Sequence, residues 1–212
     1  MVLSNYRKET SERSDPSNWA KQLLIDKVNF HLDSIEGCNQ NSLNLTTHLI
    51  ERARVDYDDT TKDTIENVGR NILLIEGEDV LNRKVKFAKR FDLPLHYVLY
   101  CDETEYVYLF KMEDPAKIEL EKSFGSYKKF SEWIKGIKGW QSSKGFREIE
   151  DLPDFDKKLR RAGTAWPTNL DCFVASEDNT PLCIIEFQNA NKTAVANHCN
   201  NDFFLCVASD QF

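Results

Sequence analysis

The 212-residue sequence lacks long apolar runs: no uninterrupted stretch approaches the roughly 20 residues that a helix needs to cross a bilayer. Its first 17 residues are polar and mixed in charge, unlike a secretory signal peptide or an amphipathic transit peptide. Low-complexity tracts and convincing internal repeats are also missing. We therefore expect a soluble protein with a cytoplasmic, intracellular location.

Paired cysteines are missing as well. The six cysteines include no C-x-x-C pair, so nothing favours a zinc knuckle or a thioredoxin-like site. His198-Cys199 with Cys206 supplies two sulfurs and one imidazole, which is a weak metal-binding pattern. We expect free thiols in a reducing compartment.

The third absence is an excess of basic residues. There are 28 Lys and Arg against 35 Asp and Glu, which gives a net charge of −7. This excludes a wholly basic protein that coats nucleic acid. The length suits one domain or two small ones. We divide the chain into an α/β region over 1–140 and a motif-bearing region over 141–212, or treat 1–212 as a single domain.

Hydrophobic periodicity predicts an α/β protein with a mixed sheet flanked by helices. The expected helices cover about 16–36, 82–92, 126–139, 154–161 and 193–205. The expected strands cover 49–57, 71–75, 93–100, 106–111, 170–176 and 182–188. Ser126 is the expected cap of the third helix and Gly139 its end, and residues 141–145 are the best linker candidate.

The last two expected strands carry polar residues suited to chemistry. Side chains alternate along a strand, so Glu186 and Gln188 point the same way. If the hairpin turns near Asp178 in an odd register, Asp171 lies opposite Glu186 or Gln188. Buried carboxylates are costly unless they are paired or bound to a cation. A Mg²⁺ ion held by two carboxylates and waters would remove that cost.

These residues resemble a known family. An Asp on one strand and Glu-x-Lys ending the next mark the PD-(D/E)XK nucleases, and residues 154–205 resemble that pattern through Pro167, Asp171 and Glu186-Phe187-Gln188. The resemblance implies a restriction-endonuclease-like fold and Mg²⁺-dependent hydrolysis of DNA in restriction or defence. Asp171 and Glu186 would bind the ion, and Gln188 would orient the attacking water. Lysine is usual at position 188, and an amide supplies no positive charge to the transition state.

Two features complicate this reading. Only about 24 residues follow Gln188, so the family fold would be circularly permuted, incomplete in this chain, or completed by a second chain. A rival site is also present, because Asp56 or Asp58 followed by Glu76-Gly77-Glu78 gives an Asp and Glu-x-Glu arrangement. The sequence leaves these alternatives open.

DNA binding needs local positive charge on this acidic chain. Basic residues gather over 83–91 and 122–147, and Lys157, Lys158, Arg160 and Arg161 directly precede Asp171. We expect the last cluster to contact phosphates without reading sequence. Because the strands of a duplex are antiparallel, we expect a homodimer. The alternatives are a non-catalytic nucleic-acid-binding or assembly module on the same fold, and an intracellular interaction protein.

Overall fold

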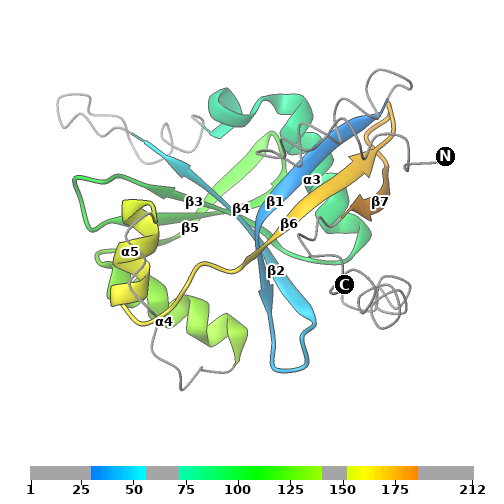
Figure 1. Ribbon diagram of the computed structural model, residues 1–212. Coiled ribbons are helices and arrows are strands. Elements are labelled where there is room, and N and C mark those ends of the chain that lie inside the picture. Colours follow the sequence, from blue (N-terminus) through cyan, green and yellow to red (C-terminus); the bar gives the residue numbers. More distant parts are fainter. Residues whose placement is uncertain (1–29, 56–71, 140–151, 186–212) are drawn as a thin grey trace, which may run out of the picture.

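The computed structural model describes residues 30–55, 72–139 and 152–185, which build a seven-stranded mixed sheet with helices on both faces (Figure 1). The strand order is β5-β4-β3-β2-β1-β6-β7, with β2 parallel to β3 and every other neighbouring pair antiparallel. The strands are β1 His31–Gln40, β2 Thr46–Arg54, β3 Leu95–Tyr100, β4 Val107–Asp114, β5 Lys117–Phe124, β6 Thr168–Ala175 and β7 Pro181–Ile185. The helices are α3 Glu78–Arg90, α4 Tyr127–Lys138 and α5 Asp154–Arg161. The expected α/β class is therefore confirmed.

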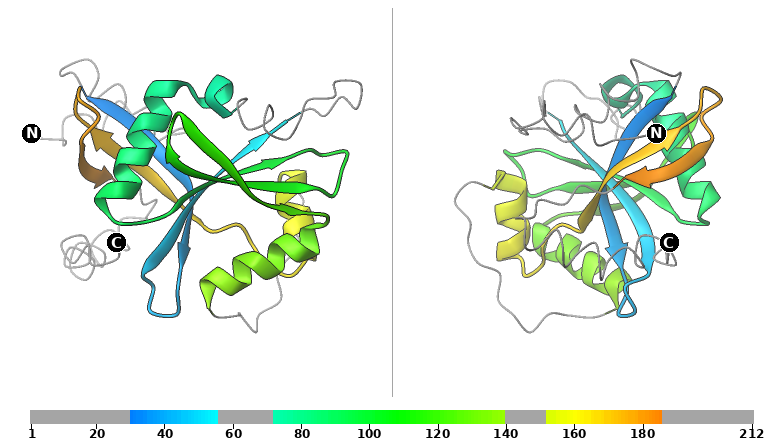
Figure 2. Two further views of the ribbon diagram at one scale, coloured as in Figure 1. Left: turned by 180° about the vertical axis from the view of Figure 1, so that it is seen from behind. Right: turned by 45° about the vertical axis from the view of Figure 1, so that its right-hand side comes forward.

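Helix α3 lies on one side of the sheet and α4 with α5 on the other (Figure 2). A large apolar cluster fills each side, and a smaller third cluster joins β1 to β6. On one face, α3 buries Leu81, Val85 and Ala88 against the strands, as its helical spacing predicts. On the other face, α4 and α5 pack together. Their buried residues include Phe130, Ile134, Phe155 and Leu159. No helix in the described ranges is long and apolar enough to cross a membrane.

The predicted boundaries of α4 are confirmed by its caps. The Ser126 hydroxyl accepts the backbone N–H of Lys129, which satisfies one of the free N–H groups of the first turn. At the other end Gly139 has φ of 70°, a left-handed conformation that glycine adopts without strain. Helix α5 also has the predicted bounds.

The sequence-based helix over 16–36 is wrong where it can be checked, because residues 31–36 belong to strand β1. Leu32 and Ile35 are both buried although they lie three residues apart, as on a helix. They belong to separate apolar clusters, so buried positions on both faces of β1 imitate the spacing of a helix. Residues 16–29 lie outside the described ranges.

The strand expected over 71–75 is also wrong, since residues 72–76 are helical. Only Ile72 of this apolar run is fully buried, whereas Leu74 is 82% exposed and Ile75 is 51% exposed. Short apolar runs do not distinguish a strand from a helix by periodicity. The segment leads through Gly77 into α3 and so places Glu76 beside that helix.

Strand β5 was not predicted. Its sequence KIELEKSF is charged at four positions and mostly exposed, so it offers little hydrophobic signal. Among the described strands it pairs with β4 alone and ends the sheet order on that side. Charged side chains are typical of such edge strands.

Candidate active-site pocket

A pocket forms where β1 and β2 separate. The two strands pair near their hairpin, from Gly37 opposite Ile50 to Gln40 opposite Thr46. Beyond this region β1 follows β6 while β2 follows β3, and the strands diverge (Figure 1). Helix α3 bridges the opening with ion pairs to both sides. Such irregular sheet positions are frequent next to functional sites.

The pocket has a volume of about 240 Å³ and a mainly polar lining. Its lining residues are Leu32, Asp33, Ser34, Glu36, Glu51, Glu76, Val80, Lys84, Asp171 and Cys172. Five of these ten residues carry carboxylates, and Lys84 is the one cation among them. The pocket therefore concentrates negative charge around a single ammonium group.

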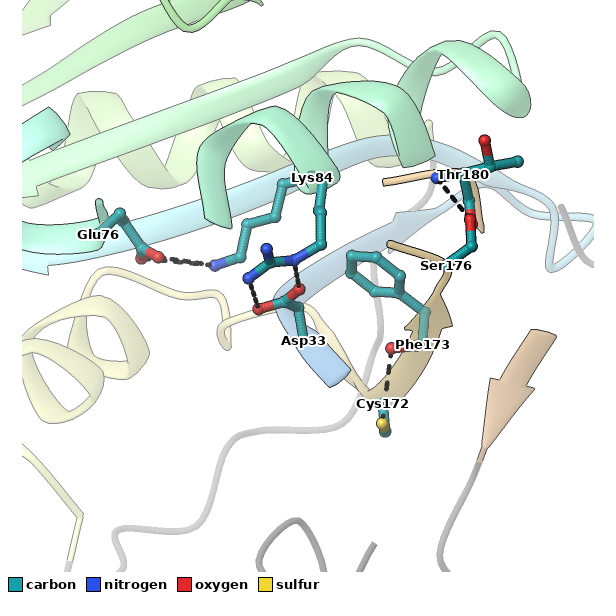
Figure 3. A network of polar contacts seen from close by, with 8 residues as sticks. Asp33, Glu76, Lys84, Cys172, Phe173, Ser176 and Thr180 are labelled. Carbon is teal, nitrogen blue, oxygen red and sulfur yellow. Dashed lines mark hydrogen bonds and ion pairs between the residues drawn. The ribbon is translucent and has the colours of Figure 1, made fainter. Parts of the chain in front are cut away.

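Lys84 joins two carboxylates in the pocket, Glu51 and Glu76, and Figure 3 shows its contact with Glu76. Its Nζ atom lies 3.0 Å from Oε2 of Glu51 and 3.3 Å from Oε2 of Glu76. Lys84 and Glu51 are 5% and 1% exposed, so both charges are removed from water. Burial alone would lower the pKa of Lys84, but Glu51 and Glu76 outweigh burial and raise it. Lys84 is therefore a permanent cation.

Glu51 behaves differently from its partner. Burial raises the pKa of Glu51 to about 7, against the opposing effect of Lys84. Its Oε1 atom accepts the backbone N–H of Glu36 at 3.2 Å, a donor released where β1 leaves β2. A carboxyl group with a pKa near neutrality can both accept and return a proton under physiological conditions.

The buried hydroxyl of Tyr97 lies near these acids. Tyr97 is opposite Glu51 in the β2–β3 pairing and is fully buried. Burial, and then the charges of Glu51 and Glu76, raise the pKa of Tyr97, so the hydroxyl keeps its proton. A side-chain hydrogen bond to Glu76 acts in the same direction, so Tyr97 belongs to the same polar group as the two acids.

Arg52 holds Glu36 from the other face of the sheet. Its Nε atom donates to Glu36 at 2.8 Å and its Nη1 atom donates to Asp156 of α5 at 2.9 Å. The guanidinium carbon lies 4.8 Å from the ring centroid of Trp166. The Trp166 indole N–H donates to the backbone oxygen of Glu36 at 3.0 Å. The connection from α5 to β6 is thereby fastened beside the pocket.

Asp171 lines the pocket and is the one predicted catalytic residue that the structure describes. Oδ1 of Asp171 accepts a hydrogen bond from the Asn169 amide at 2.8 Å. The β6–β7 hairpin has the predicted odd register, from Val174 opposite Cys183 to Cys172 opposite Ile185. Glu186 and Gln188 lie outside the described residues, so their part in the site stays a prediction.

The structure places the two glutamates of the rival site, Glu76 and Glu78, in different surroundings. Glu76 lines the pocket, but Glu78 is exposed in the first turn of α3 and does not line it. Asp56 and Asp58 fall outside the described ranges. One acid from each of the two alternative sites, Asp171 and Glu76, therefore lines the same pocket.

The expected basic cluster on α5 lies on the α4 side of the sheet, whereas the pocket lies on the α3 side. All four members have interaction partners within the protein. Lys158 donates to the backbone oxygen of Asp102 at 2.7 Å, and Lys157 lies 3.8 Å from a carboxylate oxygen of Asp154. Contact of Lys157, Lys158, Arg160 and Arg161 with DNA stays a prediction.

Sequence reasoning missed Glu51 and placed Lys84 in an ordinary basic cluster. Lys84 and its neighbour Arg83 both pair with acids of the sheet, Lys84 with Glu51 and Arg83 with Asp33. Both residues fall within a turn of the buried Leu81 and Val85, which is the signal that could have indicated burial.

The donors suit a hard cation with few protein ligands. Within residues 30–55, 72–139 and 152–185, no three His, Cys, Asp or Glu side chains are placed to hold a metal ion together. Mg²⁺ takes oxygen ligands, keeps several waters, and is commonly held by one or two carboxylates. Asp171 and Glu76 supply such oxygens. Comparisons with protein-family models, curated proteins and solved structures find no match to this chain.

Proposed function

We propose that this protein is a Mg²⁺-dependent endonuclease of the restriction-endonuclease-like, PD-(D/E)XK type that hydrolyses DNA phosphodiester bonds. One observation carries the proposal: Asp171 lines the same pocket as Lys84, which pairs there with Glu51 and Glu76. Carboxylates, a buried cation and a carboxyl group with a raised pKa are the components that metal-assisted hydrolysis requires.

Asp171 and Glu76 would hold the ion, together with Glu186 as the sequence pattern predicts. When bound, Mg²⁺ polarises a phosphate and lowers the pKa of a coordinated water. Gln188 would orient that water in line with the scissile bond. The proposal needs only one or two of these carboxylates as direct ligands.

Lys84 and Glu51 would supply the remaining chemistry. Lys84 is a permanent cation in a site of low dielectric, so it can stabilise negative charge that develops on the phosphate. This would supply the positive charge that Gln188 lacks. Glu51 can receive a proton near neutral pH, because burial raises its pKa to about 7.

A second candidate is a non-catalytic nucleic-acid-binding or assembly module. The ion pairs favour this reading, since Asp33 binds Arg83, Glu36 binds Arg52, and Glu51 binds Lys84. A carboxylate that is already paired is a weaker metal ligand.

For the endonuclease we expect a homodimer, which presents one pocket to each DNA strand. We also expect a role in restriction or defence.

Nicking and cleavage of plasmid DNA, with Mg²⁺ or with EDTA, test the proposal. We expect cleavage with Mg²⁺ alone, loss of cleavage in Asp171→Asn and Glu186→Ala, and a strong decrease in Glu76→Gln. Glu119→Gln is the matched control, because Glu119 is an exposed carboxylate on β5. DNA binding without cleavage under any divalent ion would favour the second candidate. Equal cleavage by Asp171→Asn and the wild-type protein would refute the pocket assignment.

A further inference from the structure

Helix α4 presents a row of lysines on the face of the sheet that is remote from the pocket. Lys128, Lys135 and Lys138 recur with Ser131 at spacings of three and four residues, so they share one stripe of the helix. Ser131 is buried in the middle of the stripe, and its hydroxyl donates to the backbone oxygen of Ala162 at 2.9 Å. The stripe is therefore fixed against the end of α5.

The cations of α5 continue this stripe. Arg160 and Arg161 form the last turn of α5, directly before Ala162. Nζ of Lys135 lies 2.9 Å from the position that a β-carbon on Gly163 would occupy. The stripe on α4 and the end of α5 therefore form one continuous region. We call it the α4–α5 basic surface, defined by Lys128, Lys135, Lys138, Arg160 and Arg161.

On α4 and α5, positively charged residues outnumber acidic ones. Helix α4 carries four lysines and one glutamate, and α5 carries four cations and two aspartates. Of the two aspartates, Asp156 already binds Arg52. Lys128 and Lys135 form no ion pair within the described residues. Two neighbouring helices with a clear positive excess stand out on a chain whose net charge is −7.

We propose that the α4–α5 basic surface binds the phosphate backbone of duplex DNA independently of the acidic pocket. Lys128 and Lys138 lie ten residues apart in sequence and therefore about 15 Å apart along the helix axis. A DNA strand carries one phosphate per about 3.4 Å of duplex axis, so the stripe matches about four phosphates. Lysines on one rigid helix bind phosphates as point charges and give affinity without sequence readout.

This surface does not require the proposed catalysis. The pocket is lined by residues of α3 and of the strands, whereas Phe155 and Leu159 of α5 pack with α4 on the opposite face. Anchoring on one face and hydrolysis on the other are therefore separable functions. Variants of the basic surface should weaken binding and leave the bond-breaking step of already bound DNA unchanged.

The experiment measures the affinity of the full chain for a short labelled DNA duplex over a series of salt concentrations in EDTA, where a metal-dependent enzyme does not cleave. The test variant carries Lys128→Ala, Lys135→Ala and Arg161→Ala. We expect the slope of log K against log salt to become shallower by about 2.7, which is about 0.9 for each lost phosphate contact. A second variant, Lys128→Arg with Lys135→Arg, keeps the charge and should keep the slope.

The control variant carries Lys111→Ala and Lys117→Ala. These exposed lysines of β4 and β5 both bind Glu113, so their removal should leave the slope unchanged. An unchanged slope in the triple variant, or an equal decrease in the control, overturns the inference. Binding to vesicles with anionic lipids but not to DNA also overturns it. DNA binding with this salt dependence but without cleavage under Mg²⁺ refutes the proposed function and leaves this inference standing.

Discussion

The two faces of the sheet are built on different physical principles. The α3 face buries charges, with Lys84, Glu51 and Arg83 each less than a tenth exposed and held in ion pairs. The α4–α5 face buries aromatic rings around Phe155, whose centroid lies 4.2 Å from Tyr100 and 5.5 Å from Trp166. The α4–α5 face is therefore stabilised mainly by apolar burial. On the α3 face, the cost of burying charged groups offsets part of the stability that apolar burial provides.

The difference indicates where function resides. Buried ion pairs often add little net stability, because the loss of hydration offsets the attraction between the charges. Aromatic burial stabilises a fold without such a cost. On the proposed function, the charges concentrated beside the pocket serve its chemistry, whereas the opposite face secures α4 and α5. Four substitutions sharpen this comparison.

The largest loss is expected from Phe155→Ala. Phe155 is 1% exposed and contacts rings from β3, α4 and the segment before β6. Truncation leaves a cavity and should lower the free energy of unfolding by about 3–5 kcal/mol. Urea denaturation measures this loss, which should be the same at neutral and at mildly acidic pH. A strong pH dependence would show that charged groups also dominate this face.

Lys84→Met should cost about 3 kcal/mol at mildly alkaline pH, because it leaves the buried charge of Glu51 without its main partner. Glu51 can escape this cost by taking up a proton. Its pKa is already raised above the ordinary value in the folded state, so the variant should regain stability as the pH falls. The double variant Lys84→Met with Glu51→Gln is the control and should be less destabilised than Lys84→Met alone. Equal losses in both variants would contradict the ion-pair explanation.

Arg52→Gln should cost about 2 kcal/mol, since it removes charge-assisted hydrogen bonds to Glu36 and to the buried Asp156. Arg54→Gln is the matched control two residues along the same strand. Arg54 is 54% exposed where it binds Asp102, so its removal should cost less than about 1 kcal/mol. Thermal unfolding of both variants checks the order, and a larger loss in Arg54→Gln would reverse it.

The smallest effect at neutral pH is expected from His48→Phe. His48 stacks on His96 with centroids 5.6 Å apart, and its buried Nδ1 atom lacks a partner among the described residues. An apolar ring of similar shape should change the free energy of unfolding by less than about 1 kcal/mol.

Acid should separate this variant from the wild-type protein. Burial, and then the neighbouring His96, lower the pKa of His48 to about 4, below its value of 6.5 in the unfolded chain. The unfolded state therefore binds the proton first, and stability is lost as the pH falls from about 6.5 to about 4. His48→Phe should lose less over this range in acid denaturation followed by circular dichroism. Identical acid transitions would show that His48 does not contribute.

Sequence reasoning succeeded where local signals agree. Ser126, the apolar stripe of α4 and Gly139 define one helix consistently, and the apolar runs on either side of Asp178 define the β6–β7 hairpin. It failed at β1, because this strand is buried on both faces, which puts Leu32 and Ile35 at helical spacing although they belong to separate clusters. Leu32 packs with residues of β6, which lies more than a hundred residues later in the chain.

The candidate site shows the same limit. Asp171 and Glu76 were singled out from strand-end patterns, and both line the pocket. Glu51 is followed by the charged Arg52 in β2 and has no local signal of burial, and the one signal at Lys84 is its position within a turn of the buried Leu81 and Val85. They meet only because β1 separates from β2 and α3 crosses the opening, which is a property of the tertiary fold.

The charged strand β5 has a consequence for the behaviour of the protein in concentrated solution. No described strand pairs with the outer side of β5, so its backbone N–H and C=O groups could bind a strand of another chain. Lys117, Glu119, Glu121 and Lys122 stand along that strand, so an apolar strand arriving there would have to strip water from them. The charged edge strand β5 therefore disfavours aggregation by addition of strands from other chains. Self-association would then use surfaces that are less heavily charged.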